Sequence, residues 1–306
     1  MEPADRLFIL AFDHRGSFQS KWFGIGAEPT DEETLRIADG KELIFQGLEL
    51  ALSRGAHAGT AGGLVDEQFG APKRIPDRIK KAGMKLAMPV EKSGQAEFDF
   101  EYGEEFGDHI ERFDPDFVKV LVRYNPDGDP EVNRRQAARL VALSVWLAGH
   151  GRSLLFELLV PAEDEQLASV GGDAERYDAE LRPRLMVGAI AELQDAGVEP
   201  AVWKIEGLER RDDCERVVAQ CRAGGRDQVV CVVLGRGAER SRVERWLTSG
   251  AGVDGYVGFA IGRSIWGDPL TGFLEGDLSR DQATEQVADT FAHFVEVYEG
   301  ATSSGS

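Results

Sequence analysis

Eight apolar runs recur along the chain, separated by stretches whose apolar residues have the spacing of amphipathic helices. In most runs the few polar residues stand at or near the C-terminal end. Such runs are typical of strands that are buried on both faces of a parallel sheet. We predict strands at residues 7–13, 61–66, 85–91, 116–124, 153–160, 201–207, 228–234 and 256–263.

Helices are predicted between these strands, where apolar residues return every three or four positions. In the first helix, Asp31, Glu32 and Glu33 favour the first turn, and Arg54-Gly55 marks the end. The predicted helices span residues 31–54, 75–82, 104–112, 130–150, 178–196, 211–223, 239–249 and 280–299. Residues 14–18 are predicted to form a loop after the first strand.

The alternation of strand and helix determines the predicted architecture. Eight alternations over 306 residues indicate a parallel sheet, and eight units of this length fit one closed (β/α)8 TIM barrel. An open, doubly wound sheet is the alternative, but no GxGxxG sequence follows the first strand. We therefore predict an α/β protein with one barrel domain at residues 1–300 and a disordered tail at 301–306.

Composition and charge narrow the class of protein. The chain is 42% hydrophobic and 29% charged, and no apolar run approaches the roughly 20 residues that span a membrane. The net charge of −19 argues against nucleic acid as a partner. The acidic N-terminus does not resemble a signal peptide. We expect a cytoplasmic protein that acts on a small phosphorylated molecule, alone or as a homo-oligomer.

The cysteines support the same setting. Cys214, Cys221 and Cys231 are odd in number and lack CxxC spacing. A disulfide framework would need an even set, and a metal or redox motif would need closer spacing. We therefore predict three buried thiols.

Lys204 is the most unusual polar residue, because it lies inside the apolar run Ala201–Gly207. Burial disfavours the charged ammonium and lowers the pKa of a lysine, and a neutral amine is what Schiff-base chemistry on a carbonyl requires. The simpler interpretation is an ion pair with Glu206, two residues along on the same face of the strand. Both interpretations stay open here, since structural ion pairs also perturb pKa values.

Other polar side chains stand at or near the C-terminal ends of the strands, where the active site of a TIM barrel lies. They are Asp13, Asp66, Glu91, Lys92, Lys119, Arg123, Glu157, Arg236 and Arg263. Because alternate strands share a layer inside the barrel, Lys119 and Lys204 can meet, and Glu157 between them can relay protons. Alternatively, Asp13 caps a loop, Lys119 pairs with Glu157, and Arg263 is a solvated loop residue.

Two glycine–arginine pairs follow the last two strands, in Gly235-Arg236-Gly237 and Gly262-Arg263-Ser264. In TIM barrels the loops at these positions frequently bind phosphate. Glycines let backbone N–H groups approach an anion, and arginine adds charge-assisted hydrogen bonds. We predict a phosphate site formed by Gly235, Arg236, Gly262 and Arg263.

Metal ligands are poorly represented. The histidines are His14, His57, His109, His150 and His293, and they show neither HxH nor HExxH spacing. Only His14 stands at the predicted mouth of the barrel. We therefore predict no metal site and no other cofactor.

Six short segments carry a resemblance to a known family. They are Ala11–Gly16, Leu64–Gly70, Phe117–Lys119, Phe156–Glu157, Val202–Glu206 and Gly262–Trp266. From about Leu7 to Tyr298 the chain resembles the class I aldolases of the tagatose-1,6-bisphosphate aldolase type, which include the sulfofructose-phosphate aldolases. It is most similar to the aldolase-like domain fused behind 5-dehydro-2-deoxygluconokinase in bacterial inositol catabolism.

The resemblance implies catalytic roles for Lys204, Glu157, Lys119 and Asp13, and substrate or phosphate contacts for Arg263, Arg15 and Asp66. Lys204 would form the Schiff base, with Lys119 and Glu157 assisting. One position departs from the family pattern. The tagatose-type enzymes have Asp-Gln-Arg where this chain has Asp13-His14-Arg15, which leaves the substrate open.

The sequence therefore predicts a metal-independent class I aldolase, a carbon–carbon lyase that cleaves a phosphorylated keto-sugar or keto-acid through Lys204. The resemblance implies 6-phospho-5-dehydro-2-deoxygluconate as the substrate, giving dihydroxyacetone phosphate and malonate semialdehyde. The alternatives are a transaldolase or sulfo-sugar phosphate aldolase on the same site, and a non-catalytic barrel that binds a sugar phosphate. Two lysines at interior strand positions speak against the non-catalytic barrel.

Overall fold

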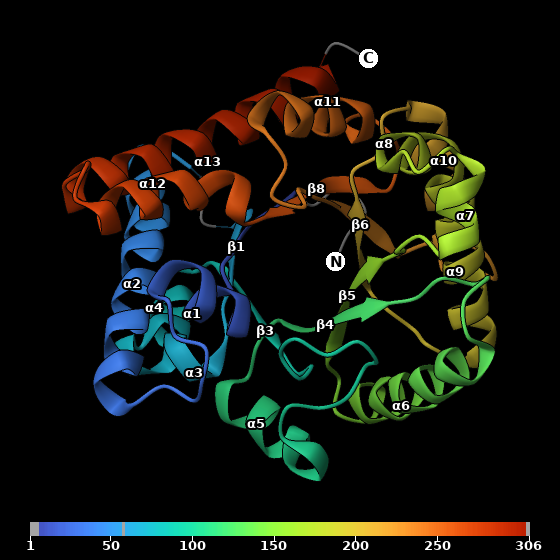
Figure 1. Ribbon diagram of the computed structural model, residues 1–306, viewed down its shortest axis with the longest axis horizontal. Helices are drawn as coiled ribbons and strands as arrows, with labels where there is room; N and C mark the ends of the chain where they lie inside the picture. The colour runs from blue at the N-terminus through green and yellow to red at the C-terminus, as the bar shows by residue number, and fades with distance from the viewer. Residues whose placement is uncertain (1–5, 57–58, 304–306) are drawn as a thin grey trace.

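Eight parallel strands form a closed barrel in the computed structural model, which describes residues 6–56 and 59–303 (Figure 1). The strands are β1 (Leu7–Ala11), β2 (Ala61–Leu64), β3 (Lys85–Pro89), β4 (Phe117–Arg123), β5 (Ser153–Leu159), β6 (Val202–Glu206), β7 (Val230–Leu234) and β8 (Tyr256–Ile261). They follow one another around the ring in chain order, and β8 pairs with β1 to close it. The predicted TIM barrel is confirmed, and the open doubly wound sheet is wrong.

Helices surround the barrel on its outside (Figure 1). The α-helices are α1 (Gly16–Phe23), α2 (Asp31–Ser53), α3 (Glu67–Gly70), α4 (Ile75–Lys81), α5 (Phe106–Phe113), α6 (Pro130–Gly149), α7 (Asp164–Ser169), α8 (Ala174–Arg176), α9 (Arg182–Ala196), α10 (Arg211–Cys221), α11 (Arg240–Gly250), α12 (Arg263–Glu275) and α13 (Arg280–Ser303). Short 3-10 turns η1 (Ala71–Lys73) and η2 (Gly103–Glu105) and a π-helical turn η3 (Tyr177–Leu181) complete the set. Over the described residues, none of these helices is long and apolar enough to cross a membrane.

Several details of the predicted secondary structure were wrong, and the short helices α3, α7 and α8 were among the elements not predicted. Residues 16–18, predicted as loop, begin α1. The helix α12 occupies 263–275, where none was predicted, although Pro269 lies inside it and proline normally ends a helix. Helix α13 continues to Ser303, so residues 301–303 are not a disordered tail. Residues 304–306 lie outside the described part of the chain.

Side chains next to the helix starts fix where several helices begin. Thr30 and Glu33 form a reciprocal capping box at the start of α2. Asp129 caps α6 by accepting hydrogen bonds from two backbone N–H groups, and Pro130 takes the first helical position, where its missing N–H costs nothing. These local signals set the ends of the helices that cover the barrel.

Apolar side chains fill the barrel on both sides of its wall. The outward-facing residues form one large cluster with the surrounding helices. A smaller cluster fills the interior and consists of Leu7, Ile9, Ala11, Leu64, Ala87, Phe117, Leu155, Val202, Val230, Val232, Val257 and Ala260. This double burial explains why the strands are nearly continuous apolar runs. The interior cluster also forms the floor on which the polar residues of the site stand.

Candidate active site

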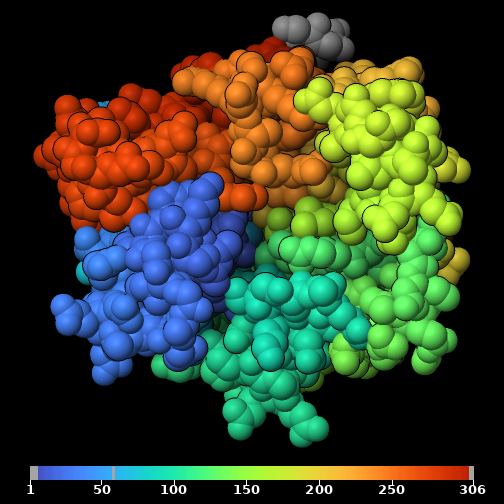
Figure 2. Space-filling view, viewed as in Figure 1, coloured from blue at the N-terminus to red at the C-terminus, as the bar shows by residue number. Residues whose placement is uncertain are grey.

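A cavity of about 720 Å³ opens at the end of the barrel where the strands terminate. It is lined by residues from strand ends and the loops that follow them, including Asp13, Lys119, Glu157 and Lys204. Seen from this side, the surface is hollowed at its centre (Figure 2). The position agrees with the place of active sites in TIM barrels.

The period of the strands puts four predicted catalytic side chains inside the barrel. Asp13, Lys119, Glu157 and Lys204 each stand two residues after a member of the interior apolar cluster, namely Ala11, Phe117, Leu155 and Val202. Residues two apart on a strand point to the same face. All four side chains are buried, so each charged group depends on its neighbours for stabilisation.

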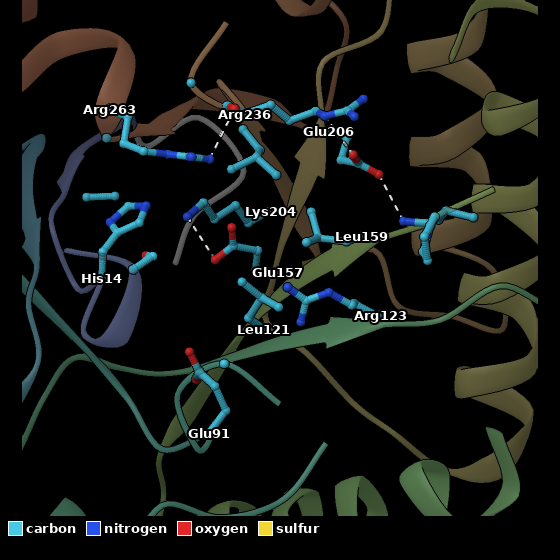
Figure 3. A pocket seen from close by; sticks show the side chains of 18 of the residues that line it. His14, Glu91, Leu121, Arg123, Glu157, Leu159, Lys204, Glu206, Arg236 and Arg263 are labelled. Carbon is cyan, nitrogen blue, oxygen red and sulfur yellow. Dashed lines mark hydrogen bonds and ion pairs between the residues drawn. The ribbon is translucent and has the colours of Figure 1, made fainter. Parts of the chain in front are cut away.

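Lys204 is paired with Glu157 on the adjacent strand. The two residues are register partners between β5 and β6, and Lys204 Nζ lies 3.0 Å from Glu157 Oε2 (Figure 3). The predicted alternative, a pair with Glu206, is wrong. Glu206 instead contacts Arg182 at 3.1 Å and Arg236 at 3.2 Å, and it accepts a hydrogen bond from the Val160 N–H.

Lys119 is held by three carboxylates. Its Nζ lies 2.8 Å from Asp13, 2.6 Å from Glu91 and 3.1 Å from Glu157. Burial alone would lower the pKa of Lys119, but the three carboxylates outweigh it and raise the pKa above the ordinary value for lysine. Lys119 is therefore a permanent cation at the centre of the site.

Asp13 and Glu157 are the anions that balance the two lysines. Burial would raise the pKa of each carboxyl group, but Lys119 and Lys204 outweigh it and hold both pKa values below their ordinary range. The same oxygen of Glu157 contacts both ammonium groups. Glu157 is therefore ionised and within reach of a proton on either lysine.

Glu91 belongs to this cluster, although the sequence analysis assigned it no catalytic role. Its Oε1 contacts Lys119, whereas Oε2 is buried and has no hydrogen-bond partner among the described residues. Burial raises the pKa of Glu91, and Lys119 and Arg15 do not fully offset this effect. Its position directly after the apolar strand β3, like that of Asp13 after β1, is the signal that could have identified it.

His14 lies beside the same cavity and its imidazole is neutral. Burial lowers the pKa of His14 to about 3, and the nearby Lys41 and Arg263 add to this effect. Its ring packs edge-on against Trp266, with 5.4 Å between the ring centroids. A neutral imidazole can both donate and accept a hydrogen bond, so His14 is suited to contact a hydroxyl group of a substrate.

Arg263 is the best placed of the predicted phosphate-binding residues. It stands in the first turn of α12, is exposed to the cavity, and donates a hydrogen bond to the backbone oxygen of Arg236 at 3.2 Å. Within the described ranges, no carboxylate pairs with it. Gly262 lines the cavity beside it and packs so closely on β1 that a Cβ atom would lie 2.3 Å from the Ala11 oxygen.

The other predicted phosphate residues are less available. Arg236 lines the cavity, but its guanidinium pairs with Asp178 at 2.8 Å and with Glu206 at 3.2 Å. Gly235 does not line the cavity, whereas Gly237 does. Of the predicted phosphate site, Arg263 and Gly262 therefore remain at the cavity, next to Gly237 and at the positive end of the α12 dipole.

Arg15 and Asp66 stabilise the structure around the cavity. Arg15 lines the cavity, but its guanidinium donates to the Glu91 backbone oxygen at 2.6 Å and to Glu101 at 2.8 Å. Asp66 is fully buried, pairs with Lys41 at 2.5 Å and caps α3. The structure does not bring Asp66 into the cavity, because Lys41 from α2 fills the space between them and hydrogen-bonds the backbone of Phe12 and His14.

The three cysteines are buried free thiols, as predicted. Burial raises the pKa of Cys214 to about 12, which keeps this thiol protonated and unreactive. In the part of the chain that the structure describes, no group of three or more His, Cys, Asp or Glu residues has the arrangement of a metal site.

Residues 1–302 match the profile of a family described as an uncharacterized protein conserved in bacteria, DUF2090. The chain belongs to this family. No curated protein matches this chain.

The DUF2090 barrel is similar in fold to fructose-bisphosphate aldolases of known structure. The Plasmodium falciparum enzyme, solved with TRAP and a small-molecule inhibitor, is 14% identical with a TM-score of 0.67, over 98% of this chain and 92% of that one. A Schiff-base-forming fructose-1,6-bisphosphate aldolase is 13% identical with a TM-score of 0.57, over 96% and 94% of the two chains. The Slackia heliotrinireducens enzyme is 13% identical with a TM-score of 0.55, over 96% and 86%. At these identities the likeness shows a common fold.

Proposed function

We propose that this protein is a class I aldolase that cleaves a phosphorylated keto-sugar or keto-acid through a Schiff base on Lys204. The observation that carries the proposal is the contrast between two buried lysines in one cavity. Lys119 contacts three carboxylates, whereas Lys204 contacts one, Glu157, among the described residues. A buried lysine with one carboxylate partner can pass its proton to that partner and attack a carbonyl carbon.

The proposed reaction uses Lys204 as nucleophile and electron sink. Its Nζ adds to the ketone carbon, and loss of water leaves an iminium ion. A base then removes the proton of the hydroxyl group beyond the bond to be cleaved. The carbon–carbon bond breaks, its electron pair moves into an enamine, and an aldehyde leaves. Protonation of the enamine and addition of water release the second product and restore Lys204.

The neighbouring charges support each proton transfer in this scheme. Glu157 lies 3.0 Å from Lys204 and can accept and return its proton. Lys119 remains charged and can stabilise negative charge that develops on a substrate oxygen. Arg263 and the first turn of α12 would hold the phosphate of the product that stays on the lysine.

The substrate we propose is 6-phospho-5-dehydro-2-deoxygluconate, cleaved to dihydroxyacetone phosphate and malonate semialdehyde. The support is the set of motifs shared with the aldolase-like domain of inositol catabolism, among them Val202–Glu206 and Gly262–Trp266. His14, where tagatose-type enzymes have glutamine, is consistent with a substrate other than tagatose 1,6-bisphosphate.

The test is a cleavage assay over a panel of ketose phosphates, with coupled detection of dihydroxyacetone phosphate. The panel contains 6-phospho-5-dehydro-2-deoxygluconate, tagatose 1,6-bisphosphate, fructose 1,6-bisphosphate and a sulfo-sugar phosphate, and the last of these tests the sulfo-sugar alternative directly. We expect the highest kcat/KM for the first compound. Transfer of the three-carbon unit to an acceptor aldehyde, without release, would identify a transaldolase. If the protein cleaves none of these compounds, the proposal is contradicted.

A further inference from the structure

The charges around the cavity differ from those of the whole chain. The protein carries a net charge of −19, yet the cavity lining contains seven lysine or arginine side chains and five aspartate or glutamate side chains. The five acids are all engaged with cations. Three lining cations, Lys92, Arg123 and Arg263, have no carboxylate partner within residues 6–56 and 59–303. A cavity with surplus cations in an acidic protein is suited to an anionic ligand.

The unpaired cations stand on opposite sides of the barrel. Arg263 follows β8 and Arg123 ends β4, four strands away in a closed ring of eight. Lys204 is on β6, two strands from each of them. Figure 3 shows Arg263 on one side of Lys204 and Arg123 on the other. A bound molecule that reaches from Arg263 to Arg123 across the mouth of the barrel therefore lies next to Lys204, the proposed nucleophile.

The β4 side of the cavity offers hydrogen-bond donors. Arg123 donates to the Gln95 backbone oxygen at 2.8 Å, which positions the guanidinium and leaves its other N–H groups available. The Gln95 side chain is oriented by the Asp99 N–H, which donates to its Oε1 at 2.7 Å. Its Nε2 is buried and has no partner in the described part of the chain. A buried donor without an acceptor is costly, and an anionic ligand would supply one.

The two sides differ in the kind of anion that they fit. Around Arg263 there are glycines and a helix N-terminus, the usual elements of a phosphate site. Around Arg123 the described residues place no helix N-terminus at the lining, and the one lining glycine there is Gly94; the side-chain donors are one planar guanidinium, the amide of Gln95 and the ammonium of Lys92. A single guanidinium matches the two oxygens of a carboxylate. Between Glu157 and Arg123 the lining is apolar, formed by Leu121 and Leu159 (Figure 3), which suits an unsubstituted methylene group.

We propose that Arg123, Lys92 and Gln95 form a subsite for a carboxylate on the half of the substrate that leaves as the aldehyde. This inference rests on the proposed function. It assigns the two ends of the substrate: the phosphate lies at Arg263, the ketone at Lys204, and a short chain ending in a carboxylate extends over Leu121 and Leu159 to Arg123.

The test measures condensation of dihydroxyacetone phosphate with malonate semialdehyde and with propanal, which has a methyl group in place of the carboxylate. We expect the wild-type protein to prefer malonate semialdehyde. Arg123→Met should lower kcat/KM for malonate semialdehyde about tenfold to a hundredfold, as for the loss of a charge-assisted bond, and should affect propanal much less. Arg210→Met, which removes an exposed arginine paired with Asp212 outside the cavity, is the matched control. Equal losses with both aldehydes would overturn the proposal.

Two further measurements separate this proposal from the proposed function. Borohydride reduction with dihydroxyacetone phosphate alone should still give an adduct on Arg123→Met; no adduct on the wild-type protein would refute the aldolase function itself. Equilibrium titration with 3-hydroxypropionate, the reduced form of malonate semialdehyde, tests the subsite without catalysis and should show weaker binding to Arg123→Met. Equal binding to both proteins would overturn the subsite.

The condensation assay with glyceraldehyde 3-phosphate tests the kind of anion that the subsite binds. A stronger preference for this aldehyde that depends on Arg123 would overturn the carboxylate assignment in favour of a phosphate.

Discussion

At the scale of single residues, the number of carboxylate neighbours distinguishes the two lysines of the site. Lys119 is surrounded by Asp13, Glu91 and Glu157, so its charge is fixed, which suits the electrostatic role that we propose for it. Among the residues described, Lys204 contacts a single carboxylate, that of Glu157, which also contacts Lys119. The sequence analysis assigned the Schiff base to Lys204 and an assisting role to Lys119. The geometry supports Lys204 as the proposed nucleophile, because its ammonium group lies 3.0 Å from one carboxylate, Glu157, which can accept a proton.

Glu91 makes a testable contribution to the pH dependence of stability. Its folded pKa is raised above the ordinary value of 4.5 by burial, so the folded state binds its proton more tightly than the unfolded state. The stability that this group contributes is present at low pH and is lost as the pH rises through its folded pKa. We expect the free energy of unfolding of wild type, relative to Glu91→Gln, to fall as pH increases. Urea unfolding of both proteins across about pH 4 to pH 8 measures this difference, and a difference independent of pH would contradict the account.

At the scale of elements, the two-residue period of the strands decides which side chains enter the cavity. Lys119 and Lys204 could be placed inside the barrel from sequence, because each interrupts an apolar strand at a position that faces the interior. The predicted pair of Lys119 with Glu157 is present at 3.1 Å, but the partners of Glu206 and Asp66 could not be predicted in the same way. Glu206 pairs with Arg182, which begins a helix, and Asp66 pairs with Lys41 from the middle of α2. Such pairs depend on how helices dock against the barrel, which local periodicity does not encode.

Closure of the barrel between β8 and β1 depends on Gly258. Its φ is +153°, and a Cβ atom there would lie 2.1 Å from the Leu7 backbone oxygen. We expect Gly258→Ala to lower the free energy of unfolding by about 1–3 kcal/mol, the usual cost of overpacking. Gly26→Ala is the control, because no described atom lies within 4 Å of the Cβ position there. Similar urea midpoints for the two variants would show that closure at Gly258 tolerates a side chain.

At the scale of the whole molecule, the fold followed from the sequence because strand and helix alternate with clear periods over the entire chain. The exceptions were local. The helix α12 was missed because it follows β8 without a break and contains Pro269. Which cations of the cavity lack a carboxylate partner could not be predicted, since this depends on which acids lie close enough to neutralise each one. Arg236 and Arg263 look alike in sequence, yet of the two only Arg236 is paired with carboxylates among the described residues.

The composition of the cavity predicts the response to chelators. The acids of the site surround the Lys119 ammonium group, and no set of metal ligands is found among the described residues. In the proposed reaction the iminium ion on Lys204 accepts the electron pair, which is the part that a metal ion plays in other aldolases. We expect the cleavage rate to be unchanged after incubation with EDTA. A loss of turnover that zinc restores would contradict this prediction.

In the proposed mechanism, Lys204 becomes covalently attached to the substrate. The most direct test is borohydride reduction in the presence of dihydroxyacetone phosphate, followed by peptide mass mapping of the wild-type protein and of Lys204→Met. We expect a stable adduct on the peptide that contains Trp203-Lys204-Ile205, and no adduct on the folded variant. An adduct on Lys119 would exchange the roles of the two lysines, and the absence of any adduct under turnover conditions would contradict the Schiff-base mechanism.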